Sequence, residues 1–164
     1  MADPVGILNW RRIDAQVTTS GQPSEAQLGE IAEMGVRTVI NLGPHDNNGA
    51  LQDEPGTVAD LGMTYVYIPV DFDAPTDADY IAFRSALDAT GGAPVHVHCI
   101  YNARVSAFFY KLAKDTKADM ETAFDRMDGI WRPGGVWAAF IDDSNSLDLP
   151  NRFAGFEYTL ETQG

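Results

Sequence analysis

The chain has 164 residues, 45% of them apolar, which is enough for one domain with a real hydrophobic core. Its 24 acidic and 11 basic residues give a formal charge of −13, which repels nucleic acids and anionic membranes, so we expect neither as a partner. With one cysteine, no basic and apolar leader segment and no apolar run of the roughly 20 residues that span a bilayer, the chain is expected to be cytoplasmic.

Strand and helix patterns alternate along the chain. Extended segments are predicted at 7–13, 17–19, 36–42, 64–70 and in the run after Gly91-Gly92 that ends at Cys99. Helices are predicted from a Ser24/Gln27 capping box to Gly35, up to about Gly62, from Thr76 with Asp79, over 105–114, from Thr116 and Asp119 to Trp131-Arg132-Pro133, and over 136–141.

This alternation predicts an α/β fold with a central, largely parallel sheet of four to five strands and helices on both faces. In such sheets ligands bind at the carboxyl ends of the strands. Residues 1–164 are expected to form a single domain, with a polar tail from about residue 142 that lies over the surface or frays.

The segment from Val95 to Ser106 holds the only cysteine, between a β-branched strand and an apolar helix. A tight turn that leads into a helix N-terminus aims unpaired N–H groups and the positive end of the helix macrodipole at one place. A thiol ionises more readily there. We therefore interpret Cys99 as a nucleophile; the alternative is a small buried hydrophobe.

The motif resembles that of the cysteine-dependent protein tyrosine and dual-specificity phosphatases, which have His-Cys, five residues, Arg, and then Ser or Thr. Here four residues separate Cys99 from Arg104, and Val105 stands at the position of the family's arginine. The chain from about Asn9 to Phe140 is similar to a family of small bacterial phosphatase-like proteins, in which this shorter spacing is not unusual. The similar pieces are Thr19–Pro23, Arg37–Leu42, Tyr67–Asp71 and Cys99–Phe108.

The resemblance implies a phosphate-binding loop in which Cys99 attacks phosphorus and Arg104 clamps two phosphoryl oxygens. Its other members would be Ile100, Tyr101, Asn102 and Ala103. The loop has no glycine, and Asn102 is the residue that best tolerates a left-handed backbone. The alternative for Arg104 is a structural ion pair at the start of a helix.

The resemblance also implies an aspartate that serves as general acid and then as general base. Asp71 and Asp73 both occupy its place, after the strand that ends near Val70. We prefer Asp71, which lies closer to the end of the strand. The alternative for each is an aspartate that only stabilises a turn.

His98 and Ser106 each have a possible functional role and a structural alternative. His98 is expected to order the loop and favour the thiolate, or to be a strand histidine with satisfied hydrogen bonds. Ser106 either donates to the thiolate or satisfies a backbone group of the helix. Because His96 and His98 would point to one face of a strand and Cys99 to the other, we predict no metal site, and no cofactor is implied.

The predicted function is hydrolysis of a phosphate monoester, such as phosphotyrosine, through a phospho-cysteine. The substrate is expected to be a phosphorylated small molecule or protein, singly phosphorylated because of the acidic charge. Two alternatives stay open: a rhodanese-like sulfurtransferase with a persulfide on Cys99, and a module that binds anions without turnover. The sequence indicates neither the physiological substrate nor the oligomeric state.

Overall fold

The computed structural model describes residues 3–46, 49–143, 147, 152–153 and 156–157. Its centre is a five-stranded sheet in the order β1-β2-β5-β3-β4, in which β1 is antiparallel to β2 and the remaining neighbours are parallel. The strands are β1 (Arg11–Arg12), β2 (Val17–Ser20), β3 (Thr38–Asn41), β4 (Thr64–Tyr67) and β5 (Val95–His98). The prediction of a largely parallel α/β sheet is confirmed.

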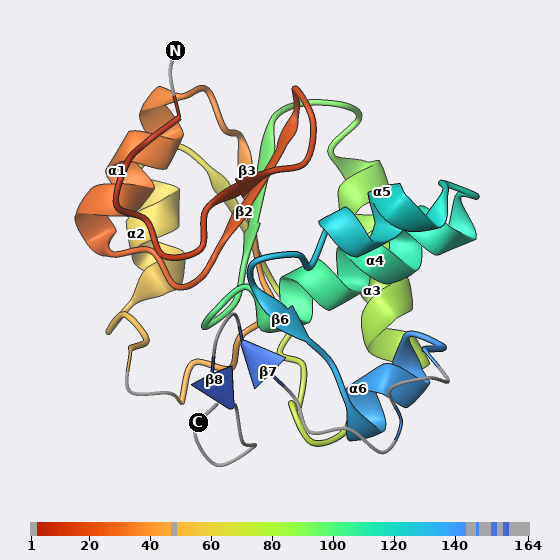
Figure 1. The fold of residues 1–164 in the computed structure, drawn as a ribbon. Coiled ribbons are helices and arrows are strands. Elements are labelled where there is room, and N and C mark those ends of the chain that lie inside the picture. The colour runs from red at the N-terminus through yellow and green to blue at the C-terminus, as the bar shows by residue number, and fades with distance from the viewer. Residues whose placement is uncertain (1–2, 47–48, 144–146, 148–151, 154–155, 158–164) are drawn as a thin grey trace.

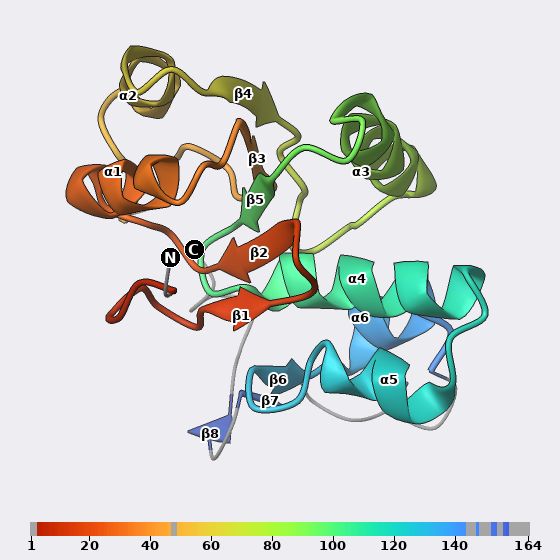
Figure 2. The same cartoon turned by 90° about the horizontal axis from the view of Figure 1, so that it is seen from above.

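Helices lie on both faces of the sheet (Figures 1 and 2). On one side α1 (Glu25–Glu33) and α2 (Glu54–Asp60) bury an apolar cluster that includes Leu28, Ile31 and Val58. The other side is covered by α3 (Asp77–Ala89) and α4 (Ala103–Asp115), with α5 (Met120–Asp125) and α6 (Gly135–Phe140) packed further out.

The predicted helix starts are largely confirmed. Ser24 with Gln27 and Thr76 with Asp79 each form a complete capping box, which satisfies two backbone donors at the first turns of α1 and α3. There are two exceptions. Thr116, expected with Asp119 at the start of the next helix, is the C-cap of α4, and Asp119 alone caps α5. Helix α4 begins at Ala103, two residues before the predicted start. The arginine of the motif is thereby in the first turn of the helix.

Two predicted elements differ from the structure. Within 7–13 only Arg11 and Arg12 pair as a strand. Trp131 and Arg132, expected to end a helix, form a short strand β6 that pairs with β7 (Arg152–Phe153), itself paired with β8 (Phe156–Glu157). Helix α5 already ends at Asp125, Gly129 has a positive φ of 79°, and Pro133 disfavours the helical conformation at Arg132. Most of the predicted polar tail lies outside the described residues.

Strand β5 occupies the middle of the sheet and is buried along its whole length. Its last residue, His98, is in register with Ser20 of β2 on one side and Asn41 of β3 on the other. The segments that follow these three strands therefore meet at one edge. Within the described part of the chain, no helix has the length and apolar character needed to cross a membrane.

Candidate active site

Cys99 follows β5 directly and is fully buried, with Val97 and Phe108 in the same apolar cluster. Two glycines allow neighbouring segments to approach it closely. A Cβ atom on Gly21, after β2, would lie 2.7 Å from the carbonyl oxygen of Ile100, and one on Gly43, after β3, would lie 3.2 Å from Cys99 Cα. Side chains at these positions would push the loop away, so the glycines determine where it sits.

The carbonyl oxygens of the loop are all engaged in hydrogen bonds. Each carbonyl oxygen from Cys99 to Asn102 accepts a hydrogen bond from the surrounding protein. The pairs are Cys99 O with His98 Nδ1 at 3.1 Å, Ile100 O with Gln22 N at 3.0 Å, Tyr101 O with Asn9 Nδ2 at 2.7 Å, and Asn102 O with Ser106 N at 2.9 Å. Because a trans peptide holds its C=O and N–H in opposite directions, the N–H groups of the same four peptides point away from these donors.

The backbone N–H groups of Ile100, Asn102 and Ala103 find no acceptor anywhere in the described part of the chain. Backbone N–H groups that lack acceptors in the described residues, next to the first turn of a helix, are the usual construction of a backbone anion site. The arrangement suits an oxyanion of a few oxygen atoms.

Asn102 is the N-cap of α4 and has the left-handed backbone conformation, with φ of 72° and ψ of 9°. Asparagine tolerates this conformation better than other residues with a side chain, as expected from the sequence. Its side-chain amide donates to the carbonyl oxygen of Asn9 at 2.9 Å and to Thr19 Oγ1 at 3.0 Å. Since Asn9 in turn donates to Tyr101 O, a pair of asparagines fastens the loop to the N-terminal segment.

Arg104 is almost completely buried, with 2% of its surface exposed. Its Nε atom donates to the carbonyl oxygen of Val70 at 2.8 Å, and its guanidinium carbon lies 5.0 Å from the centre of the Phe72 ring. A one-residue shift from the usual spacing turns a helical side chain by about 100°. The guanidinium nevertheless lies beside the loop that follows β4, and it joins that loop to the start of α4.

The two candidate acids lie on the loop that contacts Arg104, because Val70 and Phe72 flank Asp71. Both Asp71 and Asp73 are exposed. The Oδ1 atom of Asp71 accepts a hydrogen bond from the Asp73 backbone N–H at 2.9 Å, so Asp71 stabilises a turn in this structure. A second oxygen of the same carboxylate is still available for proton transfer.

The hydroxyl of Ser106 satisfies a backbone group of the helix, which was the structural alternative to a bond with the thiolate. Its hydroxyl donates to the carbonyl oxygen of Ala103 at 3.1 Å and accepts from the indole N–H of Trp131 at 3.1 Å. In this arrangement the hydroxyl proton is used within α4 rather than offered to the Cys99 sulfur.

Sequence reasoning missed Glu54 and Gln22. Glu54, in the first turn of α2, is buried and contacts His98 Nε2 at 2.6 Å through one oxygen, and its other oxygen accepts from Gln22 Nε2 at 2.8 Å. Burial by itself raises the pKa of Glu54, but the hydrogen bond and charge of His98 and the bonds from Gln22 and Tyr65 leave that pKa below its usual value. No local pattern marks a glutamate in a first helical turn as buried.

His96 has a complete set of partners of its own. Ser20 donates its hydroxyl proton to Gly21 O, so Ser20 Oγ accepts from His96 Nε2, and Thr18 donates to His96 Nδ1, both at 2.8 Å. Desolvation lowers the pKa of His96 well below its usual value, so the ring is neutral. Among the described residues, no group of three or more His, Cys, Asp or Glu side chains is arranged to hold a metal ion.

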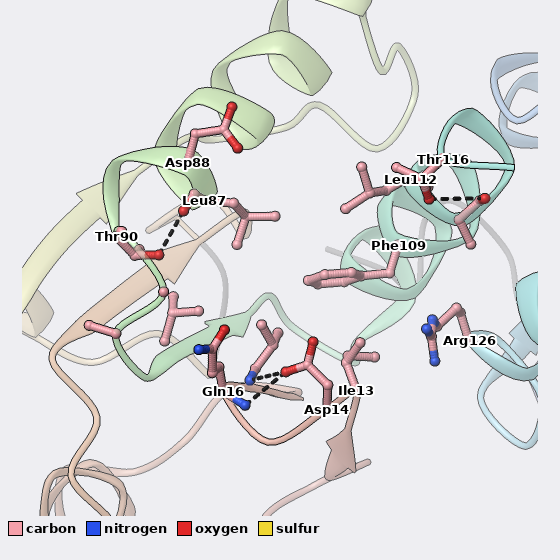
Figure 3. Close-up of a pocket in the computed structure, with 16 residues that line it drawn as sticks. Ile13, Asp14, Gln16, Leu87, Asp88, Thr90, Phe109, Leu112, Thr116 and Arg126 are labelled. Atoms are coloured by element: carbon pink, nitrogen blue, oxygen red, sulfur yellow. Dashed lines mark hydrogen bonds between the residues drawn. The ribbon is translucent and has the colours of Figure 1, made fainter. Parts of the chain in front are cut away.

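A cavity of about 510 Å³ lies at the opposite end of the sheet, where β2 and β5 begin at Val17 and Val95 (Figure 3). Leu87 of α3 and Phe109 of α4 point into it from either side. None of the predicted site residues lines this cavity, so it is separate from the Cys99 loop.

The parallel sheet, the buried cysteine at its central strand and the N–H groups before α4 define a cysteine-phosphatase-like α/β domain. The chain belongs to the family described as "Beta-lactamase hydrolase-like protein, phosphatase-like domain", whose model matches residues 9–117. The small bacterial phosphatase-like family expected from the sequence is thereby confirmed.

Known relatives agree with this family. A beta-lactamase hydrolase-like protein of Xylella fastidiosa (strain Temecula1) is 34% identical over 93 residues, which are 53% of this chain and 21% of that protein. The match thus covers about a fifth of the relative's length.

Solved structures of phosphatases are similar to this chain in fold. A DUF442 candidate phosphatase from Shewanella putrefaciens CN-32 is 33% identical with a TM-score of 0.73, covering 84% of this chain and 89% of that one. TpbA of P. aeruginosa, solved with phosphotyrosine, shares the fold at 19% identity and a TM-score of 0.60, covering 73% and 72% of the two chains.

Proposed function

We propose that this domain hydrolyses phosphate monoesters through a phospho-cysteine intermediate on Cys99. The observation that carries the proposal is the hydrogen bonding of the loop: the four carbonyl oxygens from Cys99 to Asn102 all accept hydrogen bonds, while the N–H groups of Ile100, Asn102 and Ala103 have no acceptor in the described part of the chain. Family membership and the phosphatase-like fold support the same reaction class.

In the proposed first step the Cys99 thiolate attacks phosphorus and the bond to the leaving oxygen breaks. The loop N–H groups and the Arg104 guanidinium hold the phosphoryl oxygens, whose charge is spread in a loose transition state. The carboxylic acid of Asp71, or alternatively Asp73, gives its proton to the leaving oxygen.

In the second step the same carboxylate takes a proton from water, and the water oxygen attacks the phosphorus. The sulfur–phosphorus bond breaks, and inorganic phosphate and the thiolate are released. One carboxyl group can serve both steps because it loses its proton in the first step and gains one in the second.

The substrate class proposed is a singly phosphorylated molecule, either a small metabolite or a protein residue such as phosphotyrosine. The chain's charge of −13 repels polyanions, so attraction must come from the local donors of the loop. The complex of TpbA with phosphotyrosine supports this class by similarity of fold.

The test is hydrolysis of p-nitrophenyl phosphate by the purified chain and by the Cys99→Ser variant. We expect turnover by the natural chain, its loss in Cys99→Ser, and a phosphorylated cysteine trapped by rapid acid quench. Undiminished hydrolysis in Cys99→Ser would refute the mechanism. Phosphate binding without turnover would identify an anion-binding module, and sulfur transfer from thiosulfate to cyanide would identify a sulfurtransferase.

A further inference from the structure

The imidazole of His98 is bonded at both ring nitrogens. Nδ1 lies 3.1 Å from the carbonyl oxygen of Cys99, and Nε2 lies 2.6 Å from Glu54 Oε2, with 0% and 1% of the two side chains exposed. The short contact is therefore shielded from water, where an ion pair is strongest and an unpaired charge is most costly.

The partners decide where the protons are. A carbonyl oxygen only accepts, so Nδ1 carries a proton. The Glu54 carboxyl has a lowered pKa and is ionised at neutral pH, so it also accepts, and Nε2 carries a proton too. His98 with two N–H groups is an imidazolium, and Glu54 is its counter-ion.

This pair is connected to the loop twice. His98 donates to Cys99 O, while Gln22 donates its side chain to Glu54 at 2.8 Å and its backbone N–H to Ile100 O at 3.0 Å. A charged donor polarises the peptide that accepts from it, and the N–H at the other end of that peptide becomes more positive. The peptide between Cys99 and Ile100 is in this position, and its N–H belongs to Ile100.

We propose that Glu54 is a positioning residue of the Cys99 loop: it keeps His98 cationic, and the cation both anchors the Cys99 carbonyl and strengthens the anion-binding N–H of Ile100. The role of Glu54 rests on the proposed function, since it acts on the loop that would bind phosphate. Glu54 does not touch the substrate and acts through His98.

The other titratable groups around the pair are identifiable. Tyr65 of β4 faces Glu54, and burial raises its pKa, so its hydroxyl keeps its proton. That hydroxyl accepts from Asn41 Nδ2 at 3.0 Å and shares a hydrogen bond of 2.7 Å with Nε2 of the exposed His45. The neutral His96 ring lies 6.3 Å from the His98 ring.

Glu54→Gln separates the charge from the geometry. A glutamine can accept from Gln22 and donate to a neutral His98 Nε2, so the Nδ1 bond to Cys99 O is kept while the cation is lost. The matched control is Glu33→Gln, an exposed position near the end of α1 that also removes one carboxylate.

Three measurements test the proposal. Nitrogen-15 spectra of the three histidines should show both His98 nitrogens protonated at pH 7.5 in the natural chain and one in Glu54→Gln. Alkylation of Cys99, the only thiol in the chain, should have a pH profile whose midpoint rises by about one pH unit in Glu54→Gln. Inorganic phosphate should bind roughly three- to tenfold more weakly.

The midpoint of the alkylation profile is compared, rather than a single rate, because Cys99 is buried and access slows the reaction equally at all pH values. A neutral His98 in the natural chain, or identical midpoints and phosphate affinities in Glu54→Gln and the control, would overturn the proposal. These readouts need no turnover. Absence of hydrolysis in every variant would therefore refute the proposed function alone.

Discussion

The Nε atom of Arg104 donates to the carbonyl oxygen of Val70, 2.8 Å away, which connects the start of α4 to the loop that carries Asp71 and Asp73. A lysine has no planar fork and cannot hold this carbonyl and two phosphoryl oxygens together. We expect Arg104→Lys to lower kcat/KM for p-nitrophenyl phosphate by about 100-fold or more, comparable to the loss of one strong transition-state donor. A loss below about threefold, with the fold intact by circular dichroism, would exclude Arg104 as the clamp.

The two aspartates can be distinguished by isosteric variants. Asp71→Asn retains an oxygen that accepts from the Asp73 N–H, so the turn should survive while the proton donor is lost. We expect kcat to fall by about 100-fold or more, and to fall further for phenyl phosphate, whose leaving oxygen is more basic. Asp73→Asn should change kcat by less than about threefold; the reverse pattern would assign the acid role to Asp73.

Asn102 combines a left-handed backbone with two side-chain hydrogen bonds. Asn102→Gly loses the side-chain hydrogen bonds but tolerates the positive φ. Asn102→Ala loses the hydrogen bonds and also tolerates the positive φ poorly. We expect urea unfolding to show a loss of about 1–3 kcal/mol for glycine and about 1 kcal/mol more for alanine. Equal losses in the two variants would show that backbone conformation contributes nothing measurable here.

Gly21 and Gly29 form a matched pair for the packing of the loop. A Cβ on Gly21 would meet Ile100 O at 2.7 Å, while one on Gly29, within α1, meets nothing within 4 Å. We expect Gly21→Ala to cost about 1–3 kcal/mol of unfolding free energy and to weaken phosphate binding. Gly29→Ala should stabilise the chain by about 0.5–1 kcal/mol and leave binding unchanged. Unaltered phosphate affinity in Gly21→Ala would mean that the loop does not depend on this close approach.

His96 makes the fold sensitive to acid. Its pKa is lowered well below 6.5 by burial, so below pH 6.5 the unfolded chain takes up a proton that the folded chain does not. The contribution of His96 to the free energy of unfolding is therefore fully present above pH 6.5. Below pH 6.5 this contribution falls by about 1.4 kcal/mol per pH unit, until the lowered pKa is reached. In His96→Gln, the unfolding free energy measured by urea should fall less steeply between pH 6.5 and 5. Parallel curves for the two chains would show that His96 also ionises in the folded state.

The features that depend on short stretches of chain were predictable. Capping boxes at Ser24 and Thr76 each involve side chains three residues apart, and the pattern around Cys99 indicated a strand, a turn and a helix without any tertiary information. The positive φ of Asn102 was predictable because asparagine tolerates a left-handed backbone. The parallel α/β class followed from the alternation of these elements.

The amino-acid sequence by itself thus determined most of the elements, the fold class and the position of the nucleophile candidate, because propensity, capping and hydrophobic periodicity act over a few residues. Only the tertiary structure decided which groups bond the peptides of the loop and which charged side chains lie beside them. Asn9 reaches Tyr101 across 92 positions and Glu54 reaches His98 across 44, and no local pattern encodes such contacts. They form only when the sheet brings the ends of β2, β5 and β3 to one edge, where the exclusion of water makes an ion pair and oriented N–H groups effective.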